Sequence, residues 1–270
     1  MSISGLGLTV GSTTFVNATT LTVPVTVAAG ATVGARSVTV LNGDGGTSTT
    51  SSVFTVVVAP VATSASPSSR GQGAAQATVT ITGTGFNASS TVSISGTGLT
   101  VGSTTFVDST HLTVPVAVAS NATVAARSVT VTNNDGGTST TAGVFTVVAA
   151  PVATSASPSS LGRGVVSQSV TITGTNFASG VAVTADAGSG VTVGTVTFNS
   201  ATRLTVLLSV AANATAGSRN LTFTNSDGGT STATAIIDIA ANPLVSTVTP
   251  SSIGQGASSQ TVNLTGTGFQ

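Results

Sequence analysis

Apolar and hydroxyl-bearing residues alternate with a period of two along most of the chain. In Thr78–Thr82, valine and isoleucine occupy one set of positions and threonine occupies the other, and the same alternation recurs in 111–118 and 127–132. Such alternation places the apolar side chains on one face of a β-strand. The β-branched residues that dominate these segments also favour strand over helix. The pattern therefore predicts short strands throughout and essentially no helix.

The strand pattern repeats at an interval of about 91 residues. Asp-Gly-Gly-Thr begins at Asp44, Asp135 and Asp227, and one extra residue stands between Thr184 and Gly190. This period is too long for a helical solenoid unit and suits a β-sandwich domain of about seven strands. The fold class expected is all-β, with tandem β-sandwiches, two of them complete and one split between the N- and C-termini.

The repeat gives four expected segments. Residues 60–150 and 151–242 are each predicted to form a complete β-sandwich domain. Residues 1–59 correspond to the C-terminal part of a split domain, and residues 243–270 correspond to its N-terminal strands. We expect 243–270 to complete residues 1–59 of a neighbouring subunit.

Each repeat contains the segment Asn-x-Asp-Gly-Gly, at 42–46, 133–137 and 225–229. Asp-Gly between alternating strands predicts a hairpin turn, because the turn requires a positive φ. A calcium loop needs several oxygen ligands at alternate positions and usually a closing acidic residue. Each segment holds only one carboxylate, so the hairpin is the preferred interpretation and no metal site is expected.

A fixed series of motifs runs through each repeat. It comprises Ser-Pro-Ser-Ser (66–69), Gly-x-Gly, Val-Thr-Ile-Thr-Gly-Thr-Gly-Phe (79–86), Arg-Ser-Val-Thr-Val-Thr-Asn (127–133), Asp-Gly-Gly-Thr-Ser-Thr (135–140) and Val-Phe-Thr-Val (144–147). This series resembles the bacterial IPT/TIG class of immunoglobulin-like domains. The resemblance implies a sandwich fold, usually in tandem arrays on exported or surface proteins, and no common enzymatic activity. The domain boundaries of this chain are permuted relative to the family unit.

The first and last segments of the chain match complementary parts of one repeat. Pro250–Gln270 corresponds to Pro67–Asn87, and residues 1–66 correspond to 92–157. We expect the strand at 261–265 to add to the sheet of residues 1–59 by β-strand complementation. The predicted assembly interface comprises Val262, Leu264 and Phe269 on the donated segment and Ile3, Leu8 and Phe15 on the receiving unit.

This interpretation makes the chain a structural subunit, or a segment, of an extracellular filament or cell-surface fibre. Its expected partners are copies of itself joined head to tail, a contact that closes into a ring or extends as a filament. Two alternatives stay open. The chain is a slice of a longer tandem-repeat protein, or it is an adhesin stalk or a glycan- or protein-binding module. The candidate loop for binding is Thr184–Gly190, around Asp186.

Composition narrows the classes of function. Charged residues make up 4% of the chain and the net charge is zero; all six basic residues are Arg and all six acidic residues are Asp. A nucleic-acid-binding face needs clustered basic residues, so no nucleic-acid partner is expected. There is no cysteine, which excludes disulfides and thiolate sites. No apolar run reaches membrane-spanning length, and no cofactor is expected.

Candidate catalytic groups are sparse. His111 is the single histidine, and Thr20 and Arg203 occupy its position in the other repeats. The pattern therefore indicates a variable exposed strand position rather than part of a catalytic triad. Six scattered aspartates do not favour paired-carboxylate chemistry, and the chain is not expected to be an enzyme.

Two aromatic positions recur in the repeat and are predicted to fill the core rather than bind sugars. These are Phe86, Phe177 and Phe269 at one position, and Phe15, Phe106 and Phe198 at the other. Six Asn-x-Ser/Thr sequences mark glycan acceptor sites in a host with the required machinery. They begin at Asn17, Asn87, Asn121, Asn213, Asn220 and Asn263.

Arginine and aspartate also recur at fixed positions, at opposite ends of one predicted strand. Arg36, Arg127 and Arg219 share one position, and Asp44, Asp135 and Asp227 share the other. Where one domain meets the next, these ends are expected to face each other. We predict Arg36–Asp135 and Arg127–Asp227 contacts within a chain and an Arg219–Asp44 contact between chains. The alternative is that the two ends are separate and solvated.

Overall fold

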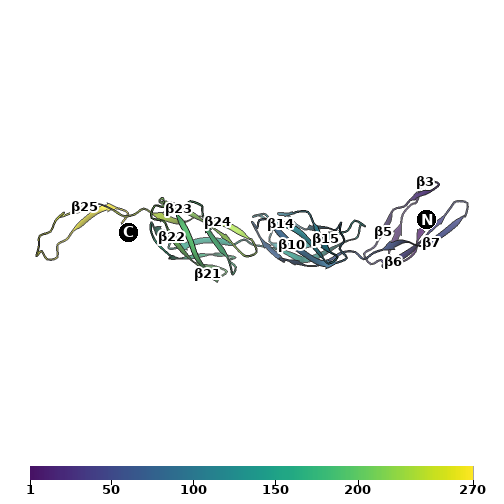
Figure 1. The fold of residues 1–270 in the computed structure, drawn as a ribbon, viewed down its shortest axis with the longest axis horizontal. Coiled ribbons are helices and arrows are strands. Elements are labelled where there is room, and N and C mark those ends of the chain that lie inside the picture. The colour runs from purple at the N-terminus through teal and green to yellow at the C-terminus, as the bar shows by residue number, and fades with distance from the viewer. Residues whose placement is uncertain (270) are drawn as a thin grey trace.

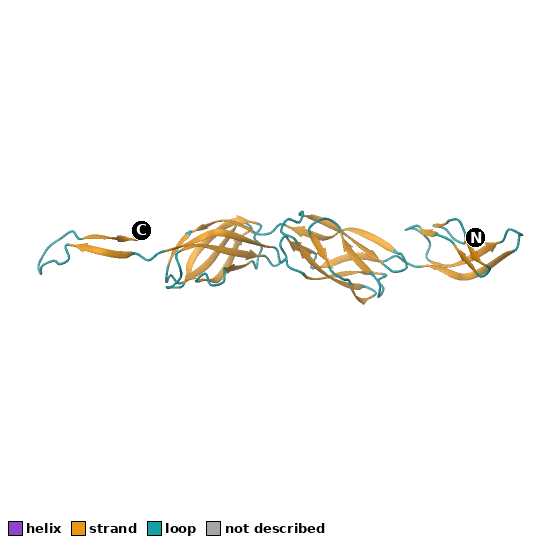
Figure 2. Ribbon diagram, turned by 90° about the horizontal axis from the view of Figure 1, so that it is seen from above, coloured by secondary structure: helices purple, strands orange, loops and turns teal. Residues whose placement is uncertain are grey.

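The computed structural model describes residues 1–269, which form strands joined by turns and loops. Two complete sandwiches occupy the centre of a row, and a thinner unit stands at each end of it (Figure 1). The view from above shows strands in all four units and no helix (Figure 2). The prediction of an all-β fold is confirmed for these residues. None of them lies in a helix long and apolar enough to cross a membrane.

Residues 60–150 form a sandwich of two sheets. One sheet has the strand order β12-β14-β10-β8, with β13 also paired to β14, and the other has the order β11-β15-β16-β9. Only β9 runs parallel to its neighbour, β16. The strands are β8 (Val61–Ser66), β9 (Ser69–Gly71), β10 (Ala77–Thr84), β11 (Thr91–Ile94), β12 (Leu99–Val101), β13 (Thr105–Asp108), β14 (His111–Val118), β15 (Ala125–Thr132) and β16 (Thr138–Val148).

The core of this sandwich comes from the apolar positions of the period-two pattern. Val79 and Ile81 of β10 stand opposite Val114 and Leu112 of β14. All four side chains are fully buried, and Phe145 of the second sheet belongs to the same cluster. The alternation read from the sequence therefore divides each strand into a core face and a threonine-rich outer face.

Residues 151–242 repeat this sandwich around a separate core. The sheet orders are β17-β19-β22-β21 and β18-β24-β23-β20. In the core, the rings of Phe177 and Phe223 lie 5.7 Å apart. The strands are β17 (Val152–Ser157), β18 (Ser160–Gly162), β19 (Gln168–Thr175), β20 (Ala182–Ala185), β21 (Val191–Ser200), β22 (Arg203–Val210), β23 (Gly217–Thr224) and β24 (Thr230–Ala240).

The two sandwiches hold more strands than the seven predicted. There are nine in residues 60–150 and eight in residues 151–242. One reason is the short parallel strand β9 or β18 that follows each Ser-Pro-Ser motif. Three residues with no alternating pattern give no strand signal, so the sequence did not reveal these elements.

Residues 1–59 contain the strands that correspond to β11–β16. They form a three-stranded sheet, β1-β6-β7, and two separate pairs, β2-β5 and β3-β4. The equivalent of β14 is divided into β4 and β5. The strands are β1 (Ser2–Ile3), β2 (Leu8–Val10), β3 (Thr14–Asn17), β4 (Thr20–Thr22), β5 (Val25–Val27), β6 (Gly34–Leu41) and β7 (Thr47–Val56).

Residues 243–269 contain one antiparallel pair, β25 (Leu244–Thr249) and β26 (Asn263–Thr267). These two strands correspond to β8 and β10. Leu264 is 55% exposed and Phe269 is 51% exposed, whereas their equivalents Ile81 and Phe86 are 0% and 4% exposed. The C-terminal unit therefore keeps the β8–β10 pairing of a complete domain but not its core. Gln270, the last residue of the predicted segment, lies outside the described residues.

Truncation of Ile81 and truncation of its equivalent Leu264 should have different effects on stability. Ile81→Ala removes a fully buried side chain, so we expect the free energy of unfolding of residues 60–150 to fall by about 2–5 kcal/mol. Leu264→Ala should leave that domain unchanged in dilute, unassembled protein. Hydrogen exchange measured by mass spectrometry on β14 peptides reports the local free energy. If both substitutions lowered the local free energy of β14 equally, the assignment of Ile81 to the core and of Leu264 to an uncovered surface would be contradicted.

Candidate functional site

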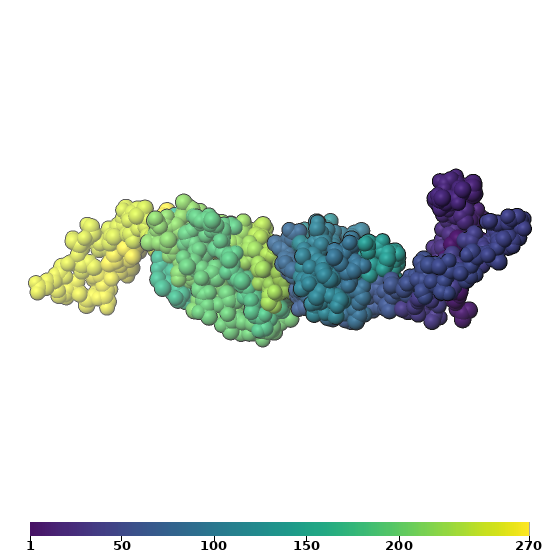
Figure 3. All heavy atoms as spheres, turned by 45° about the vertical axis from the view of Figure 1, so that its right-hand side comes forward, coloured from purple at the N-terminus to yellow at the C-terminus, as the bar shows by residue number. Residues whose placement is uncertain are grey.

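The N-terminal unit presents an uncovered apolar face. Leu21, in the divided strand, is 39% exposed, whereas its equivalent Leu112 is fully buried. Val53 is exposed, whereas its equivalent Val144 is buried. In the space-filling view the purple residues of this unit diverge into two arms (Figure 3). The N-terminal unit thus exposes side chains whose equivalents form the core of the complete repeat.

The backbone of this uncovered face is also unpaired along one edge. β4 is paired only with β3, and β5 is paired only with β2. In residues 60–150, the equivalent strand β14 is paired on its other edge with β10. Unpaired N–H and C=O groups along a strand edge are a template for an added strand. Ile3 and Leu8, predicted at this interface, are partly buried within their own unit.

The C-terminal pair carries the matching surface. β26 is paired only with β25, and both Leu264 on this strand and Val262 just before it are exposed. Phe269 packs back on its own strand: a Cβ built at Gly266 would lie 2.7 Å from the end of the Phe269 ring and 1.9 Å from the Leu244 carbonyl oxygen. Gly83 makes the same close approach to Phe86 and to the Val61 carbonyl. The Thr-Gly-Thr-Gly-Phe motif therefore fixes this corner in the same form with or without the rest of the domain.

The two recurring aromatic positions have different environments. Phe86 and Phe177 lie in the cores, as predicted. Phe106 and Phe198 remain 37% and 38% exposed in complete domains, so the prediction that they fill the core is wrong. β13 and β21, which carry them, pair only with β14 and β22 and lie at the margin of their sheets. Phe15, at the same repeat position, is exposed as well.

The Asn-x-Asp-Gly-Gly segments form the predicted hairpin turns. The backbone N–H of Asn225 donates to the Gly229 carbonyl at 2.9 Å, and the Gly229 N–H donates to the Asp227 carboxylate at 2.7 Å. The hairpins at 42–46 and 133–137 make the same bonds. The carboxylate caps its own turn, which accounts for its recurrence. Within residues 1–269, no three or more His, Cys, Asp or Glu side chains lie close enough to hold a metal ion.

Residues 60–150 and 151–242 meet through the hairpin of Asp227. The Thr230 N–H donates to the Gln72 carbonyl at 3.0 Å, and the Gly71 N–H donates to the Asp227 carbonyl at 3.4 Å. A Cβ at Gly71 would lie 2.4 Å from the Gly229 Cα. The joint is therefore a contact of backbone on backbone that tolerates only glycine at its centre.

The intrachain ion pairs Arg36–Asp135 and Arg127–Asp227 are not formed. Among residues 1–269 the one ion-pair contact is between His111 and Asp108, at 3.0 Å. The guanidinium groups of Arg36 and Arg127 donate instead to the carbonyls four residues before them, those of Thr32 and Thr123. Because these guanidinium groups donate to carbonyl oxygens of their own domain, they do not require a carboxylate of the neighbouring domain as an acceptor.

Arg219 follows the same rule. Its guanidinium donates to the Ser189 carbonyl and to the Thr215 hydroxyl, both at 2.9 Å. The predicted contact of Arg219 with Asp44 of another chain stays a prediction. The sequence did not reveal this internal satisfaction, because the accepting groups are backbone carbonyls, which carry no sequence signal.

His111 lies on the outer side of β14 beside Asp108 and Thr110. The Thr110 hydroxyl donates to Asp108 at 2.6 Å, and the Thr110 backbone N–H donates at 2.7 Å. These bonds, and to a smaller extent His111, lower the pKa of the Asp108 carboxyl to about 2. The cluster is exposed and closes the β13–β14 turn, so its hydrogen bonds have a local structural role.

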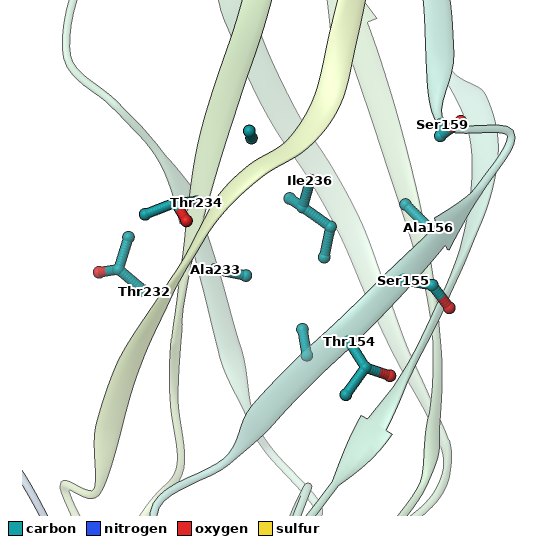
Figure 4. A pocket seen from close by; sticks show the side chains of 10 residues that line it. Thr154, Ser155, Ala156, Ser159, Thr232, Ala233, Thr234 and Ile236 are labelled. Carbon is teal, nitrogen blue, oxygen red and sulfur yellow. The ribbon is translucent and has the colours of Figure 1, made fainter.

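A groove of about 550 Å³ runs between β17 and β24 on residues 151–242. It is lined by small and hydroxyl side chains such as Thr154, Ser155, Thr232 and Thr234, and Ile236 lies between the two strands (Figure 4). No charged or aromatic side chain lines it. The loop around Asp186, the other predicted binding candidate, is a turn in which the Ser189 N–H donates to the Asp186 carbonyl at 3.1 Å.

Comparison with known proteins gives a family for part of the chain. The sequence model of the IPT/TIG domain family matches residues 60–147. No curated protein matches the sequence.

Similar solved structures have low sequence identity to this chain. The extracellular region of plexin A4 is 14% identical with a TM-score of 0.42, over 71% of this chain and 16% of that one. The Escherichia coli adhesin FdeC is 18% identical with a TM-score of 0.30, over 88% and 84% of the two chains. Yersinia pseudotuberculosis InvD is 18% identical with a TM-score of 0.26, over 68% and 60%. The chain spans 16% and 18% of the two plexin A4 structures it matches.

The family match agrees with the fold of the matched residues and with the repeat of their sequence along the chain. Residues 61–148 hold all nine strands of the first complete sandwich, and the same motifs recur on both sides of it. Residues 60–147 are an IPT/TIG domain, and motifs of this domain recur in the sequence before and after it.

Proposed function

We propose that this chain is a structural subunit of an extracellular filament, in which the C-terminal unit of one copy completes the N-terminal unit of the next. One observation carries the proposal. Side chains that are fully buried in the complete repeat are exposed in both outer units, and the two sets are complementary. The outer units stand at opposite ends of the row (Figure 1). Complementation is therefore a contact between copies rather than within one chain.

The complete domain supplies the expected register. β10 pairs with β14 with Ile81 opposite Leu112 and Val79 opposite Val114. By repeat position, Leu264 of one copy stands opposite Leu21 of the next, and Val262 stands opposite Val23. The added strand joins β4 and β5 into one continuous strand, as in β14.

A second strand pairing follows from the same comparison. β9 runs parallel to the end of β16, with Arg70 opposite Val147. The corresponding residues are Ile253 in the C-terminal unit and Val56 in the N-terminal unit. Ile253 is exposed. The donated segment thus adds to both sheets and holds them together across the core.

The apolar surface is large enough to support such an association. Val262, Leu264 and Phe269 are 40–55% exposed, so burial of their exposed surface contributes roughly 2–4 kcal/mol before the entropy of association is subtracted. The residues that receive them, including Leu21 and Val53, gain burial at the same time. Association by strand addition also satisfies the free backbone edges, which gives it a fixed register.

The contact is heterologous, because a different surface is used on each copy. Repeated heterologous contacts form an open filament unless the rotation between copies closes a ring. The near-linear row of units favours the open filament (Figures 1 and 2). A location outside the cell is supported by the IPT/TIG resemblance, which is to tandem arrays on exported and surface proteins, and by a surface rich in Ser and Thr.

A cysteine pair on the outer face of the joint should link one copy to the next. Thr80 stands opposite Thr113, so Asn263→Cys and Thr22→Cys in one chain place two thiols side by side between copies. The chain has no native cysteine. We expect oxidation to give a ladder of linked chains on a non-reducing gel. The control pairs Asn263→Cys with Thr26→Cys, about 13 Å further along the strand. Absence of the ladder, or equal ladders from both variants, would refute the register.

A charge on the inward face of the donated strand should prevent assembly. Leu264→Asp would bury a carboxylate without a partner, which costs more than the joint gains from that side chain. We expect only single chains by sedimentation velocity and no fibres by electron microscopy. Asn263→Asp, one residue away on the outward face, is the matched control and should assemble normally. Normal fibres from Leu264→Asp would show that this strand is not the donated element.

A further inference from the structure

The joint between the two complete domains has a counterpart next to the C-terminal unit. A cleft of about 400 Å³ lies there, with Gly162, Arg163, Asn242, Pro243 and Phe269 in its wall. Nothing lies within 4 Å of a Cβ built at Gly162, whereas a Cβ at the equivalent Gly71 would overlap the Asp227 hairpin. The surface around Gly162 is therefore exposed, whereas the equivalent surface around Gly71 is covered by the Asp227 hairpin.

The formed joint shows how such a surface is covered. The side-chain amide of Asn225, in the Asp227 hairpin, donates to the Asn176 carbonyl at 2.7 Å, next to Phe177. The Asn225 side chain is buried there. Asn133 makes the equivalent bond to the Gly85 carbonyl, next to Phe86, at 2.8 Å. In each complete domain, the hairpin asparagine is thus fixed at the corner that carries the buried phenylalanine.

The hairpin that fits the cleft is the one at residues 42–46 of another copy. Asn42 occupies the repeat position of Asn225 and is exposed. Gly268, which precedes Phe269, occupies the position of Asn176. If β26 completes the N-terminal unit of a second copy, Asn42 of that copy reaches the Gly268 carbonyl of the first. The hairpin then lies in the cleft as the Asp227 hairpin lies against Gly71.

The cleft differs from the formed joint in the position of its arginine, because the formed joint has Arg70 beside Gly228, where the cleft has Leu161. Arg163 occupies the position of Gln72, whose side-chain amide donates to the Ala122 carbonyl at 2.7 Å. Arg163 is partly buried, and its Nε is buried without a hydrogen-bond partner in the described residues. The opposing hairpin brings Asp44, whose Oδ1 accepts from the Gly46 N–H at 2.9 Å. That bond leaves Oδ2 free to accept from a guanidinium.

We propose that the Asp44 hairpin of one copy docks in the Arg163 cleft of the copy that donates its strand, and that Arg163 pairs with Asp44. The inference rests on the proposed strand complementation and adds a second, polar contact to that junction. Arg163 rather than Arg219 is then the partner of Asp44, because Arg219 is already bound to carbonyls of its own domain.

The pairing distinguishes the junction between copies from the joints inside the array. The equivalents of Arg163 are Gln72 and Gln255, which carry no charge. At the formed joint, Arg70 lies beside Gly228 of the hairpin, but its guanidinium donates to the Ala75 carbonyl and makes no ion pair with Asp227. An Arg163–Asp44 ion pair is therefore particular to the place where a new copy joins. A charge-assisted bond at that place favours correct head-to-tail docking over other encounters of these nearly identical domains.

A defined dimer of two full-length variants tests the inference. Leu264→Asp produces a copy that receives but does not donate, and Leu21→Asp produces a copy that donates but does not receive. Mixing them limits assembly to one junction. Arg163→Gln is placed in the donating copy and Asp44→Asn in the receiving copy; asparagine keeps an oxygen to cap the turn. Asp135→Asn in the receiving copy is the matched control.

We expect each junction substitution to raise the Kd of the dimer about three- to tenfold at low salt, with a smaller effect at high salt. The double variant should be no weaker than either single variant, because both remove the same pair. Asp135→Asn should leave the Kd unchanged. The docking inference alone would be overturned if the Asn263→Cys and Thr22→Cys variants crosslink while the Kd of the dimer is insensitive to Arg163→Gln and Asp44→Asn. Absence of any dimer would overturn the strand complementation and, with it, this inference.

Discussion

The fold depends on one strand pairing, that of β10 with β14. This pairing places Val79 and Ile81 beside Val114 and Leu112 at the centre of the core. Where the β10 position is unfilled, in residues 1–59, the strand equivalent to β14 divides into β4 and β5 and the sheet falls into separate pairs. The same central strand, placed in residues 243–269, keeps its neighbour β25 but has no core to enter. A sandwich of this kind is complete only when its central strand is present.

A second constraint, the close contact of glycines at the joints, governs how complete domains follow one another. Gly71 and Gly229 approach so closely that no side chain fits between them. Two backbone hydrogen bonds, from Gly71 and Thr230, then fix the orientation of one domain on the next. Backbone contacts of this kind hold the two domains together without an ion pair between them, which suits a chain with so few ionisable residues. They also explain why Asp-Gly-Gly recurs in each repeat.

Much of this arrangement can be predicted from the sequence, because the alternation of side chains determines the strands and the turn residues determine the hairpins. The period of two gave the strands and their inward residues, Asn-x-Asp-Gly-Gly gave the hairpins, and Thr-Gly-Thr-Gly-Phe marked the corner at Gly83 and Phe86. The parallel strands β9 and β18 were missed, since three residues carry no periodic signal. Phe106 was misassigned to the core, because alternation gives a side chain's face but not its distance from the sheet margin.

The arginine contacts show a different limit of the sequence. Arg127 and Asp227 stand at recurring positions of the sequence, but they do not pair, because the Arg127 guanidinium donates to the Thr123 carbonyl of its own domain. The sequence gives no prediction for Arg163, because Gln72 and Gln255 occupy its position in the other repeats. Its significance comes from its position in a cleft whose counterpart, around Gln72, is covered by a neighbouring hairpin.

The most direct measurement of the central claim is electron microscopy of the purified, full-length chain at increasing concentration. Strand complementation between copies predicts fibres of evenly spaced beads, in which each chain contributes three equivalent domains and the composite domain is indistinguishable from its neighbours. Fibres of paired beads separated by thin connections, or single rows of two beads that do not lengthen with concentration, would contradict it.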